Sequence, residues 1–220
     1  MTAEEIQQAN TALQGKSPQE IANWAVEHSE GSVLVSTNFR PYEAVILHLC
    51  VQARADMPVL WMDSGWNRPA TYRHAQEVIE KLNLNVTIYT PKITPAHWHA
   101  IHGDNVPTPD DGDLFKKFSH ETKIEPFLRG MKEMAPKMWV TGLRKVQNPN
   151  RANLDIVAED VNFGSVKVNP AFNMTDDDME AYLKEFDLPN EWDYFDPVKA
   201  DEKRECGLHV PVEANKGAGI

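Results

Sequence analysis

Short apolar runs alternate along the chain with longer amphipathic stretches. The apolar runs are typical of buried strands, and they lie at Val33–Val35, Val59–Met62, Val86–Tyr89 and Met138–Thr141. The stretches between them have helical spacing, and they lie at about 41–51, 69–82, 94–101 and 121–134, with an acidic, proline-containing loop at 102–113. An order of strand, helix and strand predicts a parallel sheet with right-handed crossovers.

Further elements flank this region on both sides. Ser17-Pro18-Gln19-Glu20 combines a capping serine, a proline at the first helical position and a glutamate three residues after the cap, so a helix begins there. Residues 163–168 could form a fifth strand, and Thr175 caps a helix that extends to Phe186. After Leu188 the residues are mostly polar and aromatic, and the apolar ones have neither helical nor strand spacing. This favours a docked coil followed by a mobile tail.

These elements predict an α/β fold: an open parallel sheet with helices on both faces, in a single domain with a mobile C-terminal tail. We divide the chain into an N-terminal helical segment (1–30), a ligand-binding α/β domain (31–199) and a tail (200–220). At 220 residues and 41% hydrophobic, the chain can bury a full core.

Charge and composition exclude several classes of function. The net charge of −11 argues against non-specific binding to nucleic acid, which depends on neutralising phosphates. It still allows a small anionic substrate, because a local basic cluster can oppose the overall sign. The sequence shows no secretory signal and no apolar run near the ~20 residues of a membrane span. Two cysteines and no export signal predict a reducing cytoplasm.

Three predicted strands end in polar residues that could bind an anion. The segments are Ser36-Thr37-Asn38-Phe39-Arg40, Asp63-Ser64-Gly65 and Gly142-Leu143-Arg144, the last followed by Lys145 and Arg151. Ligands of open α/β sheets bind at the carboxyl ends of the strands, and hydroxyl and amide groups at a helix start bind anions. Each segment taken alone has a structural alternative, as a helix cap, a turn or a solvated basic face.

The sequence near the C-terminus is typical of a nucleophilic thiol. Lys203-Arg204-Glu205-Cys206-Gly207-Leu208-His209 sets Cys206 behind two cations and three residues before a histidine. Cations beside a thiol favour the reactive thiolate, whereas an unassisted cysteine ionises only near pH 8.5. The alternative is an unreactive thiol in a frayed tail. The other cysteine, Cys50, lies in an apolar run and is expected to pack in the core.

Four segments together resemble the phosphoadenylyl-sulfate (PAPS) reductases, within the adenine-nucleotide α-hydrolase-like fold. They are Lys123–Phe127, Trp139–Arg144, Arg151–Leu154 and Glu205–His209, of which the last is the most specific. The resemblance implies that the first and fourth strands are neighbours. It also implies that Cys206 attacks the sulfur of the sulfonucleotide, that adenosine 3′,5′-bisphosphate leaves, and that thioredoxin or glutaredoxin releases sulfite from the cysteine S-sulfonate.

The resemblance and the strand-end pattern give one set of site residues. Cys206 is the catalytic residue, and the substrate-binding residues are Ser36, Thr37, Asn38, Phe39, Asp63, Gly65, Gly142, Leu143, Arg144, Arg151, Lys203, Arg204 and His209. The expected partners are PAPS, thioredoxin or glutaredoxin, and a second copy of the chain in a homodimer. No bound cofactor or metal is expected.

Three features bear on the comparison with the family pattern. The related adenylyl-sulfate (APS) reductases hold an iron–sulfur cluster, which needs four thiolates, and two cysteines favour the cluster-free type. Only residues 187–202 separate Phe186 from Lys203, a short segment that leaves the preference for a 3′-phosphate and the dimer contacts open. Arg40 also stands where a small residue is usual.

Other functions remain as alternatives. One is APS reduction without a cluster. Another is cleavage of ATP between its α and β phosphates, although the usual Ser-Gly-Gly-x-Asp-Ser loop lacks both glycines here. A non-catalytic nucleotide-binding or sulfur-carrier module is a third. A zinc site at His97, His99 and His102 is a fourth, but helical residues two apart face different sides.

Overall fold

The computed structural model describes residues 1–147, 154–160 and 162–198. These residues form a six-stranded sheet in the order β3-β2-β1-β4-β6-β5. The strands are β1 (Val33–Thr37), β2 (Pro58–Met62), β3 (Asn85–Tyr89), β4 (Met138–Val140), β5 (Val157–Asp160) and β6 (Ser165–Val168). The first four strands and β6 run parallel, as the sequence predicts, and β1 lies beside β4 with Leu34 opposite Trp139.

One strand was not predicted. β5 pairs antiparallel with β6, so the sheet is mostly rather than fully parallel. Its Val-Ala-Glu-Asp sequence lacks the apolar run of a buried strand, but Asp160 is buried because Lys167 and Ser165 both bind its carboxylate. The outer edge of β5 is covered by α1 (Ala3–Leu13). The Asn10 side chain donates to the Val157 carbonyl and accepts from the Val157 amide, both at 2.8 Å.

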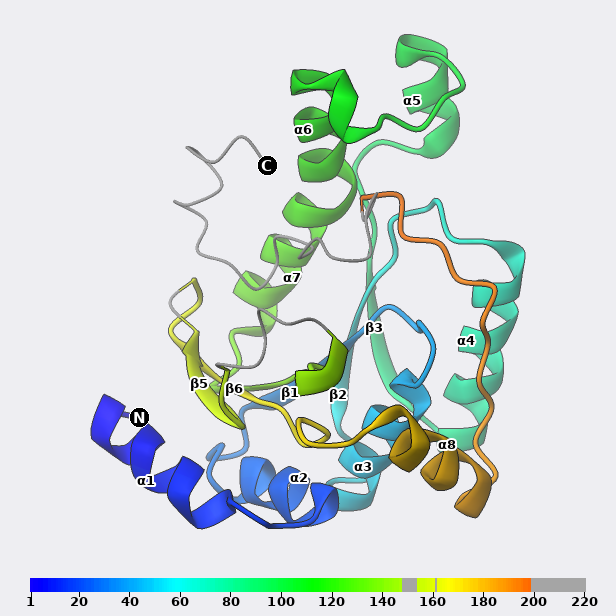
Figure 1. The fold of residues 1–220 in the computed structure, drawn as a ribbon. Coiled ribbons are helices and arrows are strands. Elements are labelled where there is room, and N and C mark those ends of the chain that lie inside the picture. Colours follow the sequence, from blue (N-terminus) through cyan, green and yellow to red (C-terminus); the bar gives the residue numbers. More distant parts are fainter. Residues whose placement is uncertain (148–153, 161, 199–220) are drawn as a thin grey trace.

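The larger part of the core lies on one face of the sheet. Helices α2 (Pro18–Glu27), α3 (Glu43–Ala53) and α4 (Pro69–Leu82) cover that face, and α8 (Asp176–Glu185) packs against α3 (Figure 1). The predicted capping box forms at Ser17, and the predicted cap at Thr175 forms too, with Asp178 completing a capping box there. The predicted helix at 69–82 has the bounds expected from its apolar spacing.

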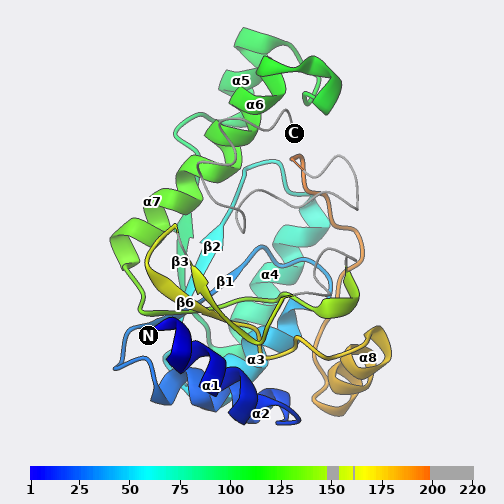
Figure 2. The same ribbon diagram turned by 60° about the vertical axis from the view of Figure 1, so that its left-hand side comes forward.

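A single helical column covers the opposite face. α6 (Asp113–Ser119) continues through a π-helical turn (His120–Ile124) into α7 (Glu125–Met134), which packs on Leu60 and Trp139 (Figure 2). The sequence predicted a helix only from Glu121, so the helix is longer than expected. The π-helical turn ends two residues before Pro126, which has no amide hydrogen to donate to a regular helix.

The upper part of α6 and helix α5 (Pro95–His102) extend beyond the carboxyl ends of the strands (Figure 1). Their contact is an aromatic cluster of Trp98, Phe115 and Phe118, joined by Val198.

Residues 188–198, here called the C-terminal strap, leave α8 and run alongside α4 toward α5 and α6 (Figure 1). Arg68 pairs with Asp193, and Val198 ends in the aromatic cluster. The strap matches the docked coil that the sequence predicts. The tail at 200–220, predicted to be mobile, lies outside the described residues. Among the described helices none is long and apolar enough to cross a membrane.

Candidate functional site

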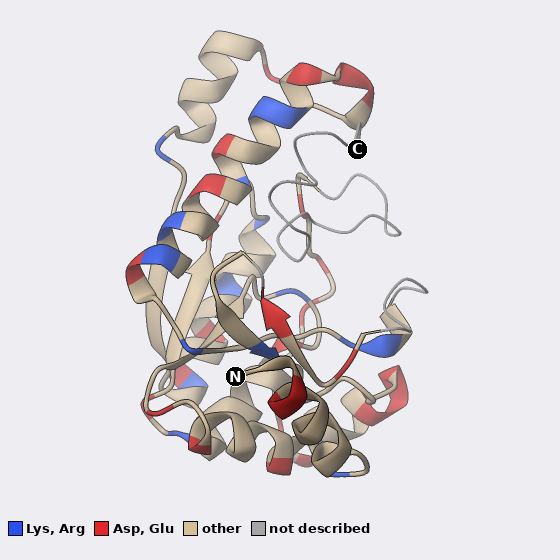
Figure 3. Cartoon of the chain, turned by 90° about the vertical axis from the view of Figure 1, so that its left-hand side faces the viewer, with Lys and Arg blue, Asp and Glu red and all other residues tan. Residues whose placement is uncertain are grey.

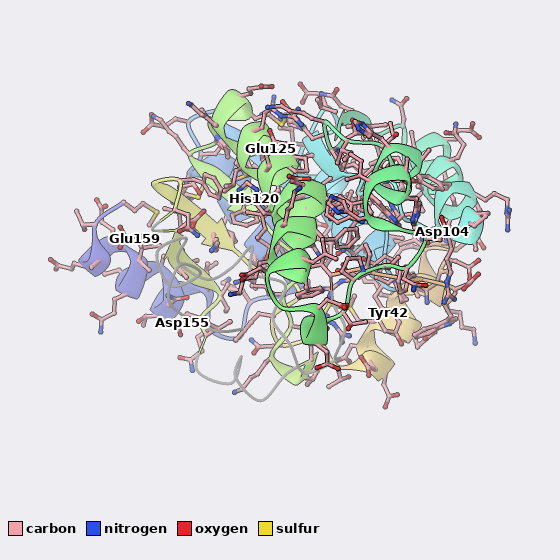
Figure 4. The ribbon with its side chains drawn as sticks, turned by 90° about the horizontal axis from the view of Figure 1, so that it is seen from above. Tyr42, Asp104, His120, Glu125, Asp155 and Glu159 are labelled. Atoms are coloured by element: carbon pink, nitrogen blue, oxygen red, sulfur yellow. The ribbon has the colours of Figure 1, made fainter. Side chains whose placement is uncertain are left out.

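The three polar segments predicted from the sequence lie at the carboxyl ends of β1, β2 and β4. Figure 4 looks onto this edge of the sheet and labels Tyr42, just before α3, with His120 and Glu125 on the helical column of the opposite face. Because β1 pairs with both β2 and β4, the three strand ends are neighbours.

The loop after β1 folds around a carboxylate that was not among the predicted site residues. Glu43 accepts a hydrogen bond from the Thr37 hydroxyl at 2.6 Å and one from the Asn38 amide at 2.8 Å. The Thr37 hydroxyl also accepts from the Phe39 amide, which tightens the turn. Ser36 points to the other face of the sheet, where its hydroxyl accepts from the Trp139 indole at 2.8 Å.

Arg40 connects the loop after β1 (residues 38–42, the β1 loop) to the loop after β4 (residues 141–144, the β4 loop). Its guanidinium pairs with Glu43 at 3.1 Å and donates to the carbonyl of Gly142 at 3.2 Å. A Cβ added at Gly142 would lie 3.5 Å from Ile46 and 3.6 Å from a Glu43 oxygen, so the loop after β4 passes close to the start of α3. The structure therefore brings together the first and third predicted segments.

The loop after β2 is organised by Asp63. One oxygen of its carboxylate accepts from the Gly65 amide, the Asn67 amide group and the Tyr72 hydroxyl, at 2.8 to 2.9 Å. Burial, and then the Asp63 charge, raise the pKa of Tyr72. Gly65 has a φ of +81°, and a Cβ there would lie 3.3 Å from the Pro95 ring, so this turn needs glycine. The contacts of Asp63 and Gly65 hold the turn in shape.

Arg144 is buried rather than presented to the strand-end surface. Its guanidinium donates to the Asp176 carboxylate at 2.7 Å and to the Met174 carbonyl at 3.3 Å, and it lies over the Tyr42 ring. Its Nε is buried and has no hydrogen-bond partner among the described residues. A substrate phosphate would have to draw Arg144 from Asp176, so its role as a phosphate ligand stays a prediction.

Two other predicted residues are part of the core. The Phe39 ring is buried edge-on against Trp61, and Leu143 is buried as well. Their side chains support the loops from beneath, which leaves backbone groups as the means by which these residues would contact a ligand. Phe39 has a φ of +52°, so its turn is a strained one for a residue other than glycine.

The C-terminal strap supplies contacts that the sequence did not indicate. The Tyr194 hydroxyl lies 2.7 Å from the Asn38 side chain, and Asp196 pairs with Lys123 of the π-helical turn. The side-chain amide group of Asn38 can hydrogen-bond with all its neighbours when its oxygen faces the Tyr194 hydroxyl. Its side-chain nitrogen then lies 3.1 and 3.2 Å from the two Glu43 oxygens. The sequence of the strap has no periodic spacing of apolar residues, so no sequence pattern could have predicted these long-range contacts.

Five predicted site residues lie outside the described residues: Arg151, Lys203, Arg204, Cys206 and His209. Cys50, by contrast, is fully buried, and burial raises the pKa of its thiol to about 12. This confirms the expectation that Cys50 packs in the core.

The three histidines considered for zinc do not converge. His99 donates to the Gly103 carbonyl, and the His102 ring packs on Trp98. Within the described part of the chain no group of three or more metal-binding side chains is found. Basic and acidic segments are interspersed in Figure 3, and in that view the described residues show no broad basic face.

Comparison with known proteins adds to this geometry. The phosphoadenosine phosphosulfate reductase domain family matches residues 32–192. The phosphoadenosine 5′-phosphosulfate reductase of Cronobacter sakazakii is 33% identical, with 91% of this chain and 89% of the relative covered. The enzyme of the same name from Synechococcus is 29% identical, with 93% and 97% covered.

A solved structure gives the same result for the fold. The crystal structure of phosphoadenylyl-sulfate (PAPS) reductase from Candida auris, a phosphate complex, superposes with a TM-score of 0.75 at 27% identity. The alignment covers 86% of this chain and 89% of that one.

Proposed function

The chain belongs to the phosphoadenosine phosphosulfate reductase domain family, and from this premise we propose that it reduces 3′-phosphoadenylyl sulfate to sulfite, as in assimilatory sulfate reduction. The observation that carries the proposal is the sequence match of this chain to phosphoadenosine 5′-phosphosulfate reductases over nearly their whole length. The loops after β1 and β4 support it, because they meet at the edge where open α/β sheets bind ligands.

In the proposed reaction the Cys206 thiolate attacks the sulfur of the sulfo group. The new S–S bond forms as the S–O bond to the nucleotide breaks, and adenosine 3′,5′-bisphosphate leaves with the electron pair. A dithiol protein, thioredoxin or glutaredoxin, then attacks the Cys206 sulfur and releases sulfite. Its second thiol resolves the mixed disulfide, so the donor ends as a disulfide and Cys206 as a thiol.

Cations are needed because an anionic thiolate approaches an anionic substrate. We propose Lys203, Arg204, Arg144 and Arg151 for this role, with arginine suited to bidentate contact with phosphate. Ser36 through Phe39, Asp63, Gly65, Gly142 and Leu143 would shape the nucleotide site. His209 would pair with the thiolate or with a substrate anion.

The remaining parts of the proposal follow from the thiol chemistry. A catalytic cysteine that must return to the thiol form works in a reducing compartment, so we propose a cytoplasmic location. The reaction needs no bound cofactor, since the external dithiol supplies both electrons. A homodimer is the proposed assembly.

The test is intact mass spectrometry of the protein after separate incubation with PAPS and with APS. A gain of one sulfonate on Cys206 with PAPS, and sulfite release when reduced thioredoxin is added, is the expected result. An adduct only with APS would assign the alternative, APS reduction without a cluster. No adduct and no sulfite with either nucleotide would contradict the proposed function.

A further inference from the structure

Glu43, the first residue of α3, lies at the centre of the β1 loop and is buried. Its carboxylate accepts hydrogen bonds from the Thr37 hydroxyl, the Asn38 amide and the Arg40 guanidinium. The Asn38 side-chain nitrogen adds a fourth contact in the orientation that satisfies Tyr194. The Glu43 carboxylate therefore already accepts the hydrogen bonds that the Thr37 hydroxyl, the Asn38 backbone amide and Arg40 donate.

These donors are the kind that would bind a phosphate. A hydroxyl and a backbone N–H in the loop that follows a parallel strand are groups that bind anions, because ligands of open α/β sheets lie at these strand ends. Here a side chain of the protein already supplies the anion. A phosphate oxygen cannot accept the same two hydrogens, and a second anion at contact distance would be repelled.

The surroundings hold the carboxylate in this place. Arg40 pairs with it and is tied to the Gly142 carbonyl, so the positive charge of the loop is already balanced. A Cβ at Gly142 would lie 3.6 Å from a Glu43 oxygen, which shows how closely the β4 loop approaches. A nucleotide phosphate that reaches Thr37 and Asn38 must first displace Glu43.

We propose that Glu43 is a specificity-determining residue whose carboxylate occupies the anion position of the β1 loop and competes with the phosphate groups of the nucleotide. The inference rests on the proposed function, since it assumes that the nucleotide binds at this edge. It predicts that removing the charge strengthens the binding of phosphorylated nucleotides and leaves the binding of adenosine unchanged.

The experiment measures dissociation constants of the full chain for adenosine 3′,5′-bisphosphate, adenosine 5′-monophosphate and adenosine. Glu43→Gln keeps the shape of the side chain, and we expect the bisphosphate to bind about tenfold more tightly, which corresponds to about 1.4 kcal/mol. Glu180→Gln is the matched control. It removes one carboxylate that accepts from the Tyr42 hydroxyl and not from the groups that donate to Glu43, so it should leave nucleotide binding unchanged.

A second variant covers the case in which Glu43→Gln does not fold. Glu43→Asp keeps the charge but withdraws it by one methylene, so it should tighten bisphosphate binding by a smaller factor. Equal or weaker bisphosphate binding in the folded variants would overturn the inference, because Glu43 would then serve only to shape the loop. If the wild type and all variants failed to bind the bisphosphate, the proposed function would be overturned, and this inference with it.

Discussion

Lys123 in the π-helical turn and Asp196 in the C-terminal strap form an ion pair that is closed to solvent, with side chains 3% and 9% exposed. The pair joins the helical column on one face of the sheet to the segment that leads toward Cys206. Buried charges are stable only when paired, because each has lost its hydration. The pair thus fixes the strap ten residues before the cysteine.

Replacing Asp196 with Asn should destabilise the protein, by up to about 3–5 kcal/mol, because the buried Lys123 charge loses the carboxylate with which it pairs. Urea unfolding of the two proteins measures the difference. Asp113→Asn is the control, since Asp113 is exposed and its pairing with Lys116 contributes little. Equal losses in the two variants would show that the strap does not depend on the buried pair.

Local patterns predicted most of the fold because they act over a few residues. The capping box at Ser17 and Glu20 and the apolar run before Asp63 each specify their element without help from distant parts of the chain. β5 escaped prediction for the opposite reason. Its Asp160 is compatible with burial only because Lys167, seven residues later on a paired strand, balances the charge.

The candidate site was less predictable than the fold. The sequence located the strand-end loops, but it could not show that Glu43 would accept the hydrogen bonds of the β1 loop or that Asp176 would hold Arg144. A glutamate at the start of a helix is common, since it interacts well with the helix dipole, so Glu43 carried no distinctive signal. Such contacts depend on how the loops pack in three dimensions.

Gly130 should not tolerate a side chain. A Cβ there would lie 2.8 Å from Leu60 and 2.9 Å from the Tyr89 ring, because α7 packs closely on β2 and β3. Alanine favours helix by up to about 1 kcal/mol over glycine, but overpacking costs about 1–3 kcal/mol. We expect Gly130→Ala to lower the free energy of unfolding by about 1 kcal/mol, the difference between these two effects. Thermal or urea unfolding measures it.

Gly142→Ala is the matched control for that variant. Its Cβ would meet only ordinary contacts, at 3.5 Å and beyond, so stability should change little. If Gly130→Ala proved as stable as the wild type, the packing of α7 on the sheet would have to be looser than the structure indicates.

Stability should decrease as the pH falls below about 6.5, the usual pKa of histidine. Burial lowers the pKa of His74 and of His48, and the nearby carboxylates of Glu77, Glu191 and Glu43 only partly offset this for His74. Above pH 6.5 both histidines are neutral in the folded and the unfolded chain. Below it the unfolded chain takes up protons that the folded chain resists, so stability is lost until the lowered pKa is reached.

Urea unfolding at pH 7.5 and pH 5.5 checks this expectation. In His74→Gln the loss between the two pH values should be smaller than in the wild type, because one buried histidine no longer titrates. An equal loss in both proteins would assign the pH dependence to other groups.

Cys206→Ser should abolish sulfite release while nucleotide binding is largely retained. Serine keeps the size of the side chain, but its hydroxyl is not ionised at neutral pH and cannot form the S-sulfonate. Sulfite formation from PAPS with reduced thioredoxin, and the dissociation constant of adenosine 3′,5′-bisphosphate, give the two measurements. Turnover near that of the wild type would remove Cys206 from the mechanism.

Cys50→Ala is the variant to compare with Cys206→Ser, because it distinguishes a cysteine that packs in the core from the nucleophilic cysteine. The Cys50 thiol is fully buried and its pKa is raised to about 12 because burial disfavours the thiolate, so it cannot replace Cys206 as the nucleophile. Its loss removes packing in the core and should cost stability, on the order of 1 kcal/mol, with the rate of sulfite formation unchanged. The two cysteines should therefore give opposite results in the two assays: Cys206→Ser loses activity and keeps stability, and Cys50→Ala loses stability and keeps activity. If Cys50→Ala lost activity while remaining folded, the assignment of a single reactive thiol would be wrong.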